Sequence, residues 1–236
     1  MADVRRFKNR AQAGKLLATA LGAYAHQREA IVLALPRGGV PVAFAVAMAL
    51  GLELDILLVR KLGLPRQPEY AIGAVGSGGV LVVQAGVPGL MGVTQEQIDA
   101  IAARELLEIE RRTRLYRGGR ALPTLSGRSV IIVDDGIATG STMQAAVQVA
   151  RQQGAGRVVV AAPVAPPDTL TVLAAQADEL VCLAAPPYFR AVSQWYDTFD
   201  QTSDEEVQDL LAMAWRSQED RQPHEQLHHI KGEDTT

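Results

Sequence analysis

The sequence has almost none of the residues that build disulfide or cysteine–metal sites. Among its 236 residues there is a single cysteine, Cys182, and it lies within the apolar run ELVCLAAP. One thiol cannot form a disulfide framework or a cysteine metal cluster, so we expect Cys182 to be a small core residue. Stability must then come from an ordinary hydrophobic core, for which the length and the 48% of hydrophobic residues suffice.

Long apolar runs and a strong excess of charge are also missing. No uninterrupted apolar stretch approaches the roughly 20 residues of a membrane span, because Gly51, Glu53 and Asp55 interrupt the best candidate. The N-terminal MADVRRFKNRAQAGKLL is polar and amphipathic, unlike a secretory signal. A formal charge of −3 gives no reason to expect a nucleic acid or an anionic membrane as partner. We therefore expect a soluble, cytoplasmic protein.

Apolar runs and helical segments alternate along the chain. Strands are predicted at AIVLA, ELDILLVRKLG, SVIIV, RVVVAAPVA and ELVCLAA, and helices at about 7–27, 41–51, 94–116, 141–153 and 168–177. The strands show little in–out alternation, which indicates a mainly parallel sheet covered by helices on both faces. We predict an α/β fold with a single domain over residues 1–217 and a polar, flexible tail at 218–236.

Two segments do not fit this alternation. Residues 62–93 are rich in Gly and Pro and contain two short apolar pieces, which predicts a hairpin or flap inserted into the fold. Residues 186–200 hold five of the eleven aromatic residues. We expect them either to form a small hood on which a planar ligand stacks or to be a hydrophobic cluster that holds the last helix.

The unusual residues follow the strands, where ligands gather in parallel sheets. PRGG follows the first strand, Arg60 and Lys61 end the second, and DDGIATGST follows the third. In the last of these, Gly136 and Gly140 leave backbone N–H groups accessible at the start of a helix, a setting that suits a phosphate. A strand-to-helix turn that is only structural does not require two carboxylates at the edge of a buried sheet. The adjacent acids Asp134 and Asp135 therefore indicate a binding site.

A nucleoside triphosphate loop is the obvious competitor for this motif. That loop requires G-x-x-x-x-G-K-[ST], and here no lysine precedes Ser141. Two acids directly before the loop would also repel a polyphosphate. A sugar phosphate fits better, because its monophosphate would occupy the loop while the acids accept hydrogen bonds from vicinal hydroxyls.

VIIVDDGIATGST closely resembles the phosphoribosyl pyrophosphate (PRPP) signature of type I phosphoribosyltransferases, in which four apolar residues and two acids precede a loop ending in T-G-[ST]. LPRGG resembles the pyrophosphate loop of that family, and VRKLG resembles the basic dipeptide that ends its second strand. The resemblance spans roughly residues 28–185. Over nearly its whole length the chain also resembles an uncharacterised bacterial branch of the family.

The resemblance implies roles for the residues of the third strand end. Asp134 and Asp135 would hold the ribose 2- and 3-hydroxyls. The 5-phosphate would be bound by residues 136–142, namely Gly136, Ile137, Ala138, Thr139, Gly140, Ser141 and Thr142. Ala138 stands where members acting on 6-oxopurines often carry an acid, and this argues against hypoxanthine or guanine as the acceptor.

The resemblance also implies how pyrophosphate is bound. Arg37, Gly38 and Gly39 would contact it, and Lys61 with Arg60 would neutralise it as it leaves. Mg²⁺ binds largely through substrate phosphates and water, so no dedicated protein cage is required, and Asp134 or Asp135 would reach it through water. The implied activity is transfer of the 5-phosphoribosyl group from PRPP to an unidentified, nitrogenous small-molecule acceptor.

Two other functions stay open at this point. A non-catalytic PRPP-binding regulator would use the same motif, although the chain has no separate winged-helix segment and no basic excess for binding nucleic acid. A hydrolase of phosphorylated sugars is disfavoured by the lack of a G-x-S-x-G elbow, a Cys–His pair or a histidine metal cluster in the folded part. The sequence leaves open whether the protein forms a homo-oligomer.

Overall fold

A parallel β-sheet forms the centre of the molecule. The computed structural model describes residues 6–64, 67–83, 86, 89 and 91–221. The sheet has the order β2-β1-β6-β7-β8, and all of its strand pairs are parallel. Its strands are β1 (Ala30–Ala34), β2 (Glu53–Ile56), β6 (Ser129–Val133), β7 (Arg157–Val164) and β8 (Glu179–Ala184). This confirms the predicted α/β fold.

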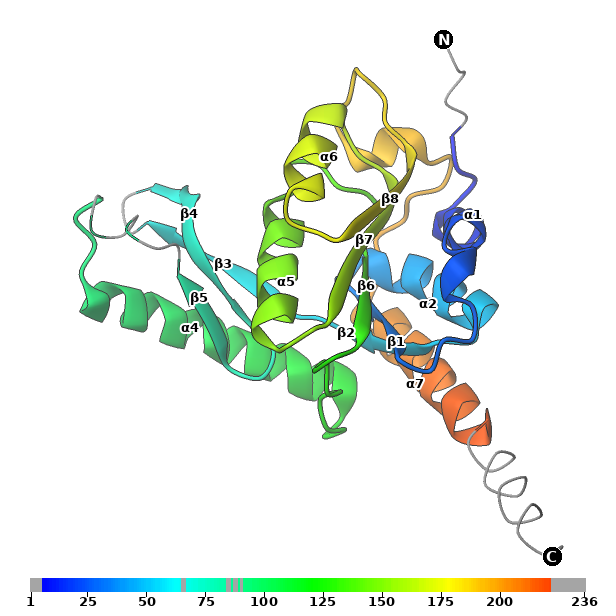
Figure 1. The fold of residues 1–236 in the computed structure, drawn as a ribbon, viewed down its shortest axis with the longest axis horizontal. Coiled ribbons are helices and arrows are strands. Elements are labelled where there is room, and N and C mark those ends of the chain that lie inside the picture. The colour runs from blue at the N-terminus through cyan, green and yellow to red at the C-terminus, as the bar shows by residue number, and fades with distance from the viewer. Residues whose placement is uncertain (1–5, 65–66, 84–85, 87–88, 90, 222–236) are drawn as a thin grey trace, which may run out of the picture.

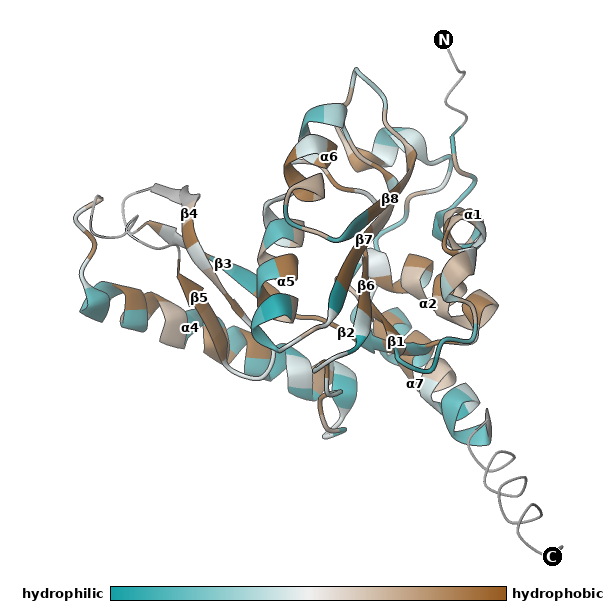
Figure 2. Ribbon diagram, viewed as in Figure 1, coloured by the Kyte–Doolittle hydropathy of each residue, from teal (hydrophilic) through white to brown (hydrophobic). Residues whose placement is uncertain are grey.

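Helices cover both faces of the sheet (Figure 1). One face is covered by α1 (Arg10–Ala20), α2 (Gly39–Leu50) and α7 (Asp204–Arg221), and the other by α5 (Ser141–Gln152) and α6 (Pro167–Ala174). Successive side chains of β1 therefore enter different cores: Val32 packs with the first set of helices and Leu33 with the second. Figure 2 shows the resulting concentration of apolar residues along β1, β6 and β7. None of the described helices is long and apolar enough to cross a membrane.

The second predicted strand is in fact two strands in different sheets. After β2 the chain leaves the parallel sheet, and β3 (Val59–Leu64), β4 (Gln67–Gly76) and β5 (Val80–Val83) form an antiparallel sheet. The expectation that Arg60 and Lys61 end a strand of the central sheet was therefore wrong, because both lie on β3. The continuous apolar run concealed the break, since the residues between β2 and β3, Leu57 and Leu58, are as buried as the strands.

The antiparallel sheet and a long helix form an arm beside the central domain (Figure 1). The flap predicted at 62–93 corresponds to these three strands, which begin earlier, at Val59, and contact α5. Helix α4 (Gln95–Arg117) packs on β3 and β4. Thr94 and Gln97 form a capping box at its start, and Gly118 ends it with a left-handed backbone (φ 55°).

Both ends of the described chain depart from the predicted boundaries. The first helix was predicted from about residue 7, but α1 begins at Arg10, after the cap Asn9, and is followed by a short 3₁₀ helix, η1 (Gly22–Tyr24). Phe7 instead pairs with Tyr196, next to the 3₁₀ helix η2 (Val192–Trp195). At the other end, α7 continues to Arg221, past the start of the predicted tail. Residues 222–236 lie outside the described part of the chain.

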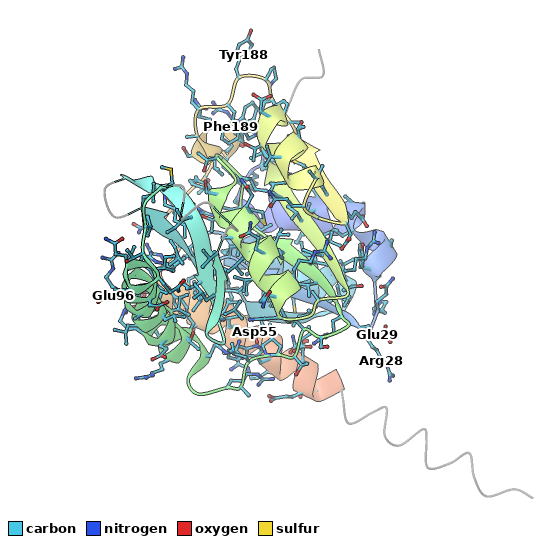
Figure 3. All side chains as sticks on the ribbon, turned by 60° about the vertical axis from the view of Figure 1, so that its left-hand side comes forward. Arg28, Glu29, Asp55, Glu96, Tyr188 and Phe189 are labelled. Atoms are coloured by element: carbon cyan, nitrogen blue, oxygen red, sulfur yellow. The ribbon has the colours of Figure 1, made fainter. Side chains whose placement is uncertain are left out.

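A buried ion pair connects the arm to the central sheet. Arg117, the last residue of α4, donates from Nη1 to Oδ1 of Asp55 on β2, and their side chains are 1% and 4% exposed. The carboxyl group lies in the interior, below α5 in Figure 3. Burial raises the pKa of Asp55, and the Arg117 charge opposes that rise. Nε and Nη2 of Arg117 donate to the carbonyls of Arg120 and Ala121, so each nitrogen of the guanidinium has a hydrogen-bond partner.

Replacing Arg117 tests this connection. Arg117→Met leaves Asp55 buried without its partner, and we expect a loss of about 3–5 kcal/mol in the free energy of unfolding. Arg114→Met is the matched control, because Arg114 lies on the same helix with 81% of its side chain exposed, and a change within about 0.5 kcal/mol is expected there. Urea denaturation measures both. Equal stability of the two variants would contradict a structural role for the pair.

Candidate functional site

The two glycine-containing loops predicted to bind the ligand lie side by side. Strands β1 and β6 are parallel neighbours, with Ala34 opposite Val133, and Leu35 N–H extends the pairing by donating to the Val133 carbonyl at 2.9 Å. The PRGG loop therefore starts beside the acids that follow β6. The Pro36–Arg37 peptide bond within this loop is cis.

Gly38 and Gly39 have no space for a side chain. A Cβ at Gly38 would overlap Oδ2 of Asp135, and one at Gly39 would lie 2.7 Å from the Val133 carbonyl and 3.0 Å from Cα of Asp134. The loop backbone thus packs directly on the acid pair. The sequence predicted these glycines for contact with a ligand, and the structure adds a packing reason for them.

Asp134 and Asp135 are adjacent acids largely removed from water. Asp134 is half-buried and Asp135 is 9% exposed, and the Asp135 N–H donates to Oδ1 of Asp134 at 2.8 Å. Burial, and then the Asp135 charge, raise the pKa of Asp134 well above its ordinary value. Burial also raises the pKa of Asp135, although Arg10 opposes the rise. Two carboxylates held this way gain from any hydrogen-bond donor or cation that enters.

Arg10 is the partner of Asp135 that sequence reasoning missed. Its Nε donates to Oδ2 of Asp135 at 2.8 Å, and both side chains are nearly buried, 12% and 13% exposed. Its Nη1 donates to the Asp200 carbonyl at 2.6 Å, and the guanidinium lies 3.9 Å from the centre of the Phe199 ring. Arg10 comes from α1, 125 residues before Asp135, so no local pattern could reveal the pair.

The loop from Gly136 to Gly140 is fixed by the elements around it. A Cβ at Gly136 would lie 2.5 Å from Cγ1 of Val192, so η2 closes over the start of the loop. Thr169 of α6 donates to the Ala138 carbonyl at 2.8 Å, and Ile137 N–H bonds the Val164 carbonyl at 2.9 Å. Gly140 then adopts a left-handed backbone (φ 78°) before α5.

The start of α5 is open to an anion. No side chain caps this helix, so its first N–H groups retain the partial positive charge of a helix N-terminus. The hydroxyls of Thr139 and Ser141 lie 3.3 Å apart on the exposed side of the loop. Together these groups provide the donors that a monophosphate requires.

Basic residues of the arm face this helix start across a cleft. The cleft has a volume of about 570 Å³ and lies between β3, α4 and Thr142 of α5; it is lined by Val59, Arg60, Lys61, Gly63, Leu64, Ile101, Arg104, Glu105 and Thr142. Arg60 and Arg104 both contact Glu105, at 2.8 and 3.1 Å. Hydrogen bonds from these two arginines outweigh burial and lower the pKa of Glu105. The structure thus brings Arg60 and Lys61 to the same side of the site as Thr142.

Arg37, in the PRGG loop, faces the start of α7. Its Nη1 is 3.7 Å from Oδ1 of Asp204, the first residue of α7. A smaller hollow between this loop and the arm is lined by Pro36, Arg60, Arg112 and Thr142, among others. Arg112 is a further cation at this hollow, and it also pairs with Glu108 at 2.7 Å. From the sequence, the arginines of this helix could be paired surface charge, a subunit contact or extra affinity for phosphate.

The aromatic residues at 188–199 form a cluster with the N-terminal segment. Tyr196 is buried, lies 5.5 Å from Phe7 between ring centres, and donates from its hydroxyl to the Asp135 carbonyl at 2.5 Å. Phe189 stacks on Trp195, while Tyr188 projects from the loop tip, 90% exposed (Figure 3). The cluster therefore packs on α1 and the acid loop. Of the two alternatives, a hydrophobic cluster is present, although its partner is the N-terminal segment instead of the last helix.

The chemistry of the acid pair fits a magnesium ion bound through water. Among the described residues there is no group of three or more His, Cys, Asp or Glu side chains that could hold a metal directly. Asp134 and Asp135 nevertheless present carboxylate oxygens at one strand end, and Mg²⁺ prefers such oxygens together with water and phosphate. A metal here would be shared between the acids and a phosphorylated ligand.

Comparison with known proteins agrees with this geometry. The family model described as "Phosphoribosyl transferase domain" matches residues 5–186. This match includes the strands, both glycine loops, the arm and α1. The chain belongs to the phosphoribosyl transferase domain family.

Two proteins are similar to this chain over most of its length. "Putative phosphoribosyl transferase Rv0571c" of Mycobacterium tuberculosis is 49% identical over 210 residues, which are 89% of this chain and 47% of that protein. The chain thus spans about half the length of the curated relatives it matches. The crystal structure of TT1426 from Thermus thermophilus is 45% identical with a TM-score of 0.81, covering 88% of this chain and 98% of that one.

The Gly38 packing gives a direct test of the site's construction. Gly38→Ala places a methyl group where Asp135 Oδ2 lies, so we expect the free energy of unfolding to fall by about 1–3 kcal/mol. Gly22→Ala is the control, because nothing lies within 4 Å of a Cβ there. Chemical denaturation compares the two variants. A Gly38→Ala protein as stable as Gly22→Ala would show that the loop does not press on the acid.

The raised pKa of Asp134 predicts a variant that is more stable than the wild type. The pKa of Asp134 in the folded protein lies above that of an unfolded aspartate, which is about 4. The folded protein therefore loses stability as pH rises from about 4 through the folded pKa, and this stability stays lost at neutral pH. Asp134→Asn removes this cost and keeps an oxygen for the Asp135 N–H. We expect a higher Tm at pH 7, by roughly 2–4 °C per kcal/mol recovered, and no gain below about pH 4.

The control for this prediction is Asp209→Asn, which removes the same charge from an exposed position on α7. Calorimetry at neutral and acidic pH measures both proteins. A lower Tm for Asp134→Asn than for Asp209→Asn at pH 7 would show that the Asp134 carboxylate stabilises the fold.

Proposed function

We propose that this protein is a phosphoribosyltransferase that binds PRPP with Mg²⁺ and transfers the 5-phosphoribosyl group to a nitrogenous acceptor, releasing pyrophosphate. One observation carries the proposal: the acid pair, the PRGG loop and the uncapped start of α5 meet at one edge of the sheet. Family membership supports the choice of ligand.

The loop and acids would hold the sugar phosphate end. In this proposal the 5-phosphate accepts hydrogen bonds from the backbone of residues 136–142 and from the hydroxyls of Thr139, Ser141 and Thr142. The ribose 2- and 3-hydroxyls donate to Asp134 and Asp135. Because Asp135 already accepts a hydrogen bond from Arg10, the Asp134 carboxylate is the less neutralised member of the pair.

The basic residues would hold the pyrophosphate end. Gly38 and Gly39 offer backbone groups, and Arg37, Arg60 and Lys61 supply positive charge. Asp134 or Asp135, acting through water, would hold Mg²⁺ together with the phosphates of the ligand, and the metal would supply positive charge that stabilises the leaving pyrophosphate. The cleft beside Thr142 leaves space for this end of the ligand.

The protein contributes positioning and electrostatics to the reaction. As the bond between ribose C1 and the pyrophosphate oxygen breaks, its electron pair leaves with pyrophosphate and the sugar gains oxocarbenium character. The lone pair of an acceptor nitrogen forms the new bond to C1 from the opposite face, and the acceptor then loses a proton. The acid pair keeps the ribose in place, and the cations stabilise the departing charge.

PRPP titration and a pyrophosphate-release assay test the proposal. We expect wild-type protein to bind PRPP by calorimetry in the presence of Mg²⁺, and to release pyrophosphate with one of a panel of bases and amines. Asp134→Asn combined with Asp135→Asn should weaken PRPP binding by about 10-fold or more, on the order of the 1.4 kcal/mol that each factor of ten represents, while circular dichroism shows the fold retained.

Three outcomes decide between the possible functions. No PRPP binding by the wild type would contradict the proposal. Binding without pyrophosphate release would favour a non-catalytic PRPP-binding regulator. Unchanged affinity in the double variant would show that the acids do not hold the ribose.

A further inference from the structure

The guanidinium of Arg37 faces a carboxylate of the protein itself. The 3.7 Å between its Nη1 and Oδ1 of Asp204 exceeds hydrogen-bond distance, and the two side chains are 37% and 42% exposed. An ion pair this long and this exposed is weak. An anion of higher charge that enters beside the PRGG loop can therefore displace Asp204 from Arg37.

Asp204 is nevertheless held in place by a second element. Tyr116, on the last turn of α4, donates from its hydroxyl to the same Oδ1 at 2.6 Å. Its side chain is buried, and burial together with the hydrogen bond to Asp204 raises the pKa of Tyr116 to about 12. The phenol therefore stays protonated and keeps donating, so the carboxylate remains next to the loop.

We propose that Asp204, fixed by Tyr116, is a positioning residue that limits the affinity of the site for pyrophosphate by competing for Arg37. The inference rests on the function proposed above, in which Arg37 contacts pyrophosphate. Asp204 pairs with Arg37 when the site is empty and repels the phosphates when they are bound. When pyrophosphate leaves, the ion pair between Asp204 and Arg37 forms again, and this favours release of the product.

Asp204→Asn tests the inference with little change of shape. The amide keeps an oxygen for Tyr116 but has no charge to compete for Arg37 or repel phosphate. Glu206→Gln is the matched control, because Glu206 is an exposed acid in the same first turn of α7. We expect Asp204→Asn to bind pyrophosphate, in Mg²⁺ buffer, about 2- to 5-fold more tightly than Glu206→Gln, as calorimetry measures.

Tyr116→Phe provides a second measurement that retains the charge of Asp204. Without the phenol, the Asp204 carboxylate can turn away from Arg37. We therefore expect Tyr116→Phe to bind pyrophosphate more tightly than the wild type and less tightly than Asp204→Asn. Equal or weaker binding by Asp204→Asn than by Glu206→Gln would overturn the inference and leave the proposed function intact. If the wild type binds no pyrophosphate, the proposed function fails, and this inference with it.

Discussion

The parallel pairing of β1 with β6 is the constraint on which the rest of the structure depends. It brings together two chain segments that are far apart in the sequence, so that Gly38 and Gly39 press on Asp134 and Asp135. Glycine is required at these two positions because the acid carboxylates and the β6 backbone already fill the space. The same strand also positions the uncapped start of α5, since β6 ends at Val133 and the helix begins at Ser141.

Two adjacent carboxylates that are largely removed from water are unfavourable for stability, and the charges around Asp134 and Asp135 show how the fold accommodates them. The Asp135 charge is offset by Arg10, and Arg10 in turn is held by Phe199 and the Asp200 carbonyl. Burial, and then the Asp135 charge, raise the pKa of Asp134, and Arg10 opposes this rise only weakly. Binding sites often retain such unfavourable groups because a ligand relieves them. The arrangement joins α1 and the aromatic cluster directly to the residues proposed to bind the ribose.

Local sequence patterns predicted the parts of the structure that local chemistry determines. The start of α4 near Thr94, four of the five predicted strands and the DDGIATGST turn all depend on residues a few positions apart, and each is present as predicted. The split between β2 and β3 was missed because an apolar run does not show which sheet its residues join. Arg10 and Asp204 were missed for a related reason: each acts on a residue that is distant in the chain.

The arginines of α4 in the arm also show what local sequence patterns cannot predict. On α4, Glu110 and Arg114 form an exposed ion pair at the i,i+4 spacing that a helix favours. Arg117 lies on the same helix, yet it is buried against Asp55 and connects the arm to the sheet. Only the tertiary arrangement distinguishes the arginines that face water from those that face Asp55 or the cleft.

The crystal structure of the protein with PRPP and Mg²⁺ would test the central claim most directly. The account predicts the 5-phosphate against residues 136–142, both ribose hydroxyls on Asp134 and Asp135, and the pyrophosphate beside Arg37, Gly38 and Gly39. A ligand bound elsewhere, or one whose ribose hydroxyls make no contact with either acid, would contradict it.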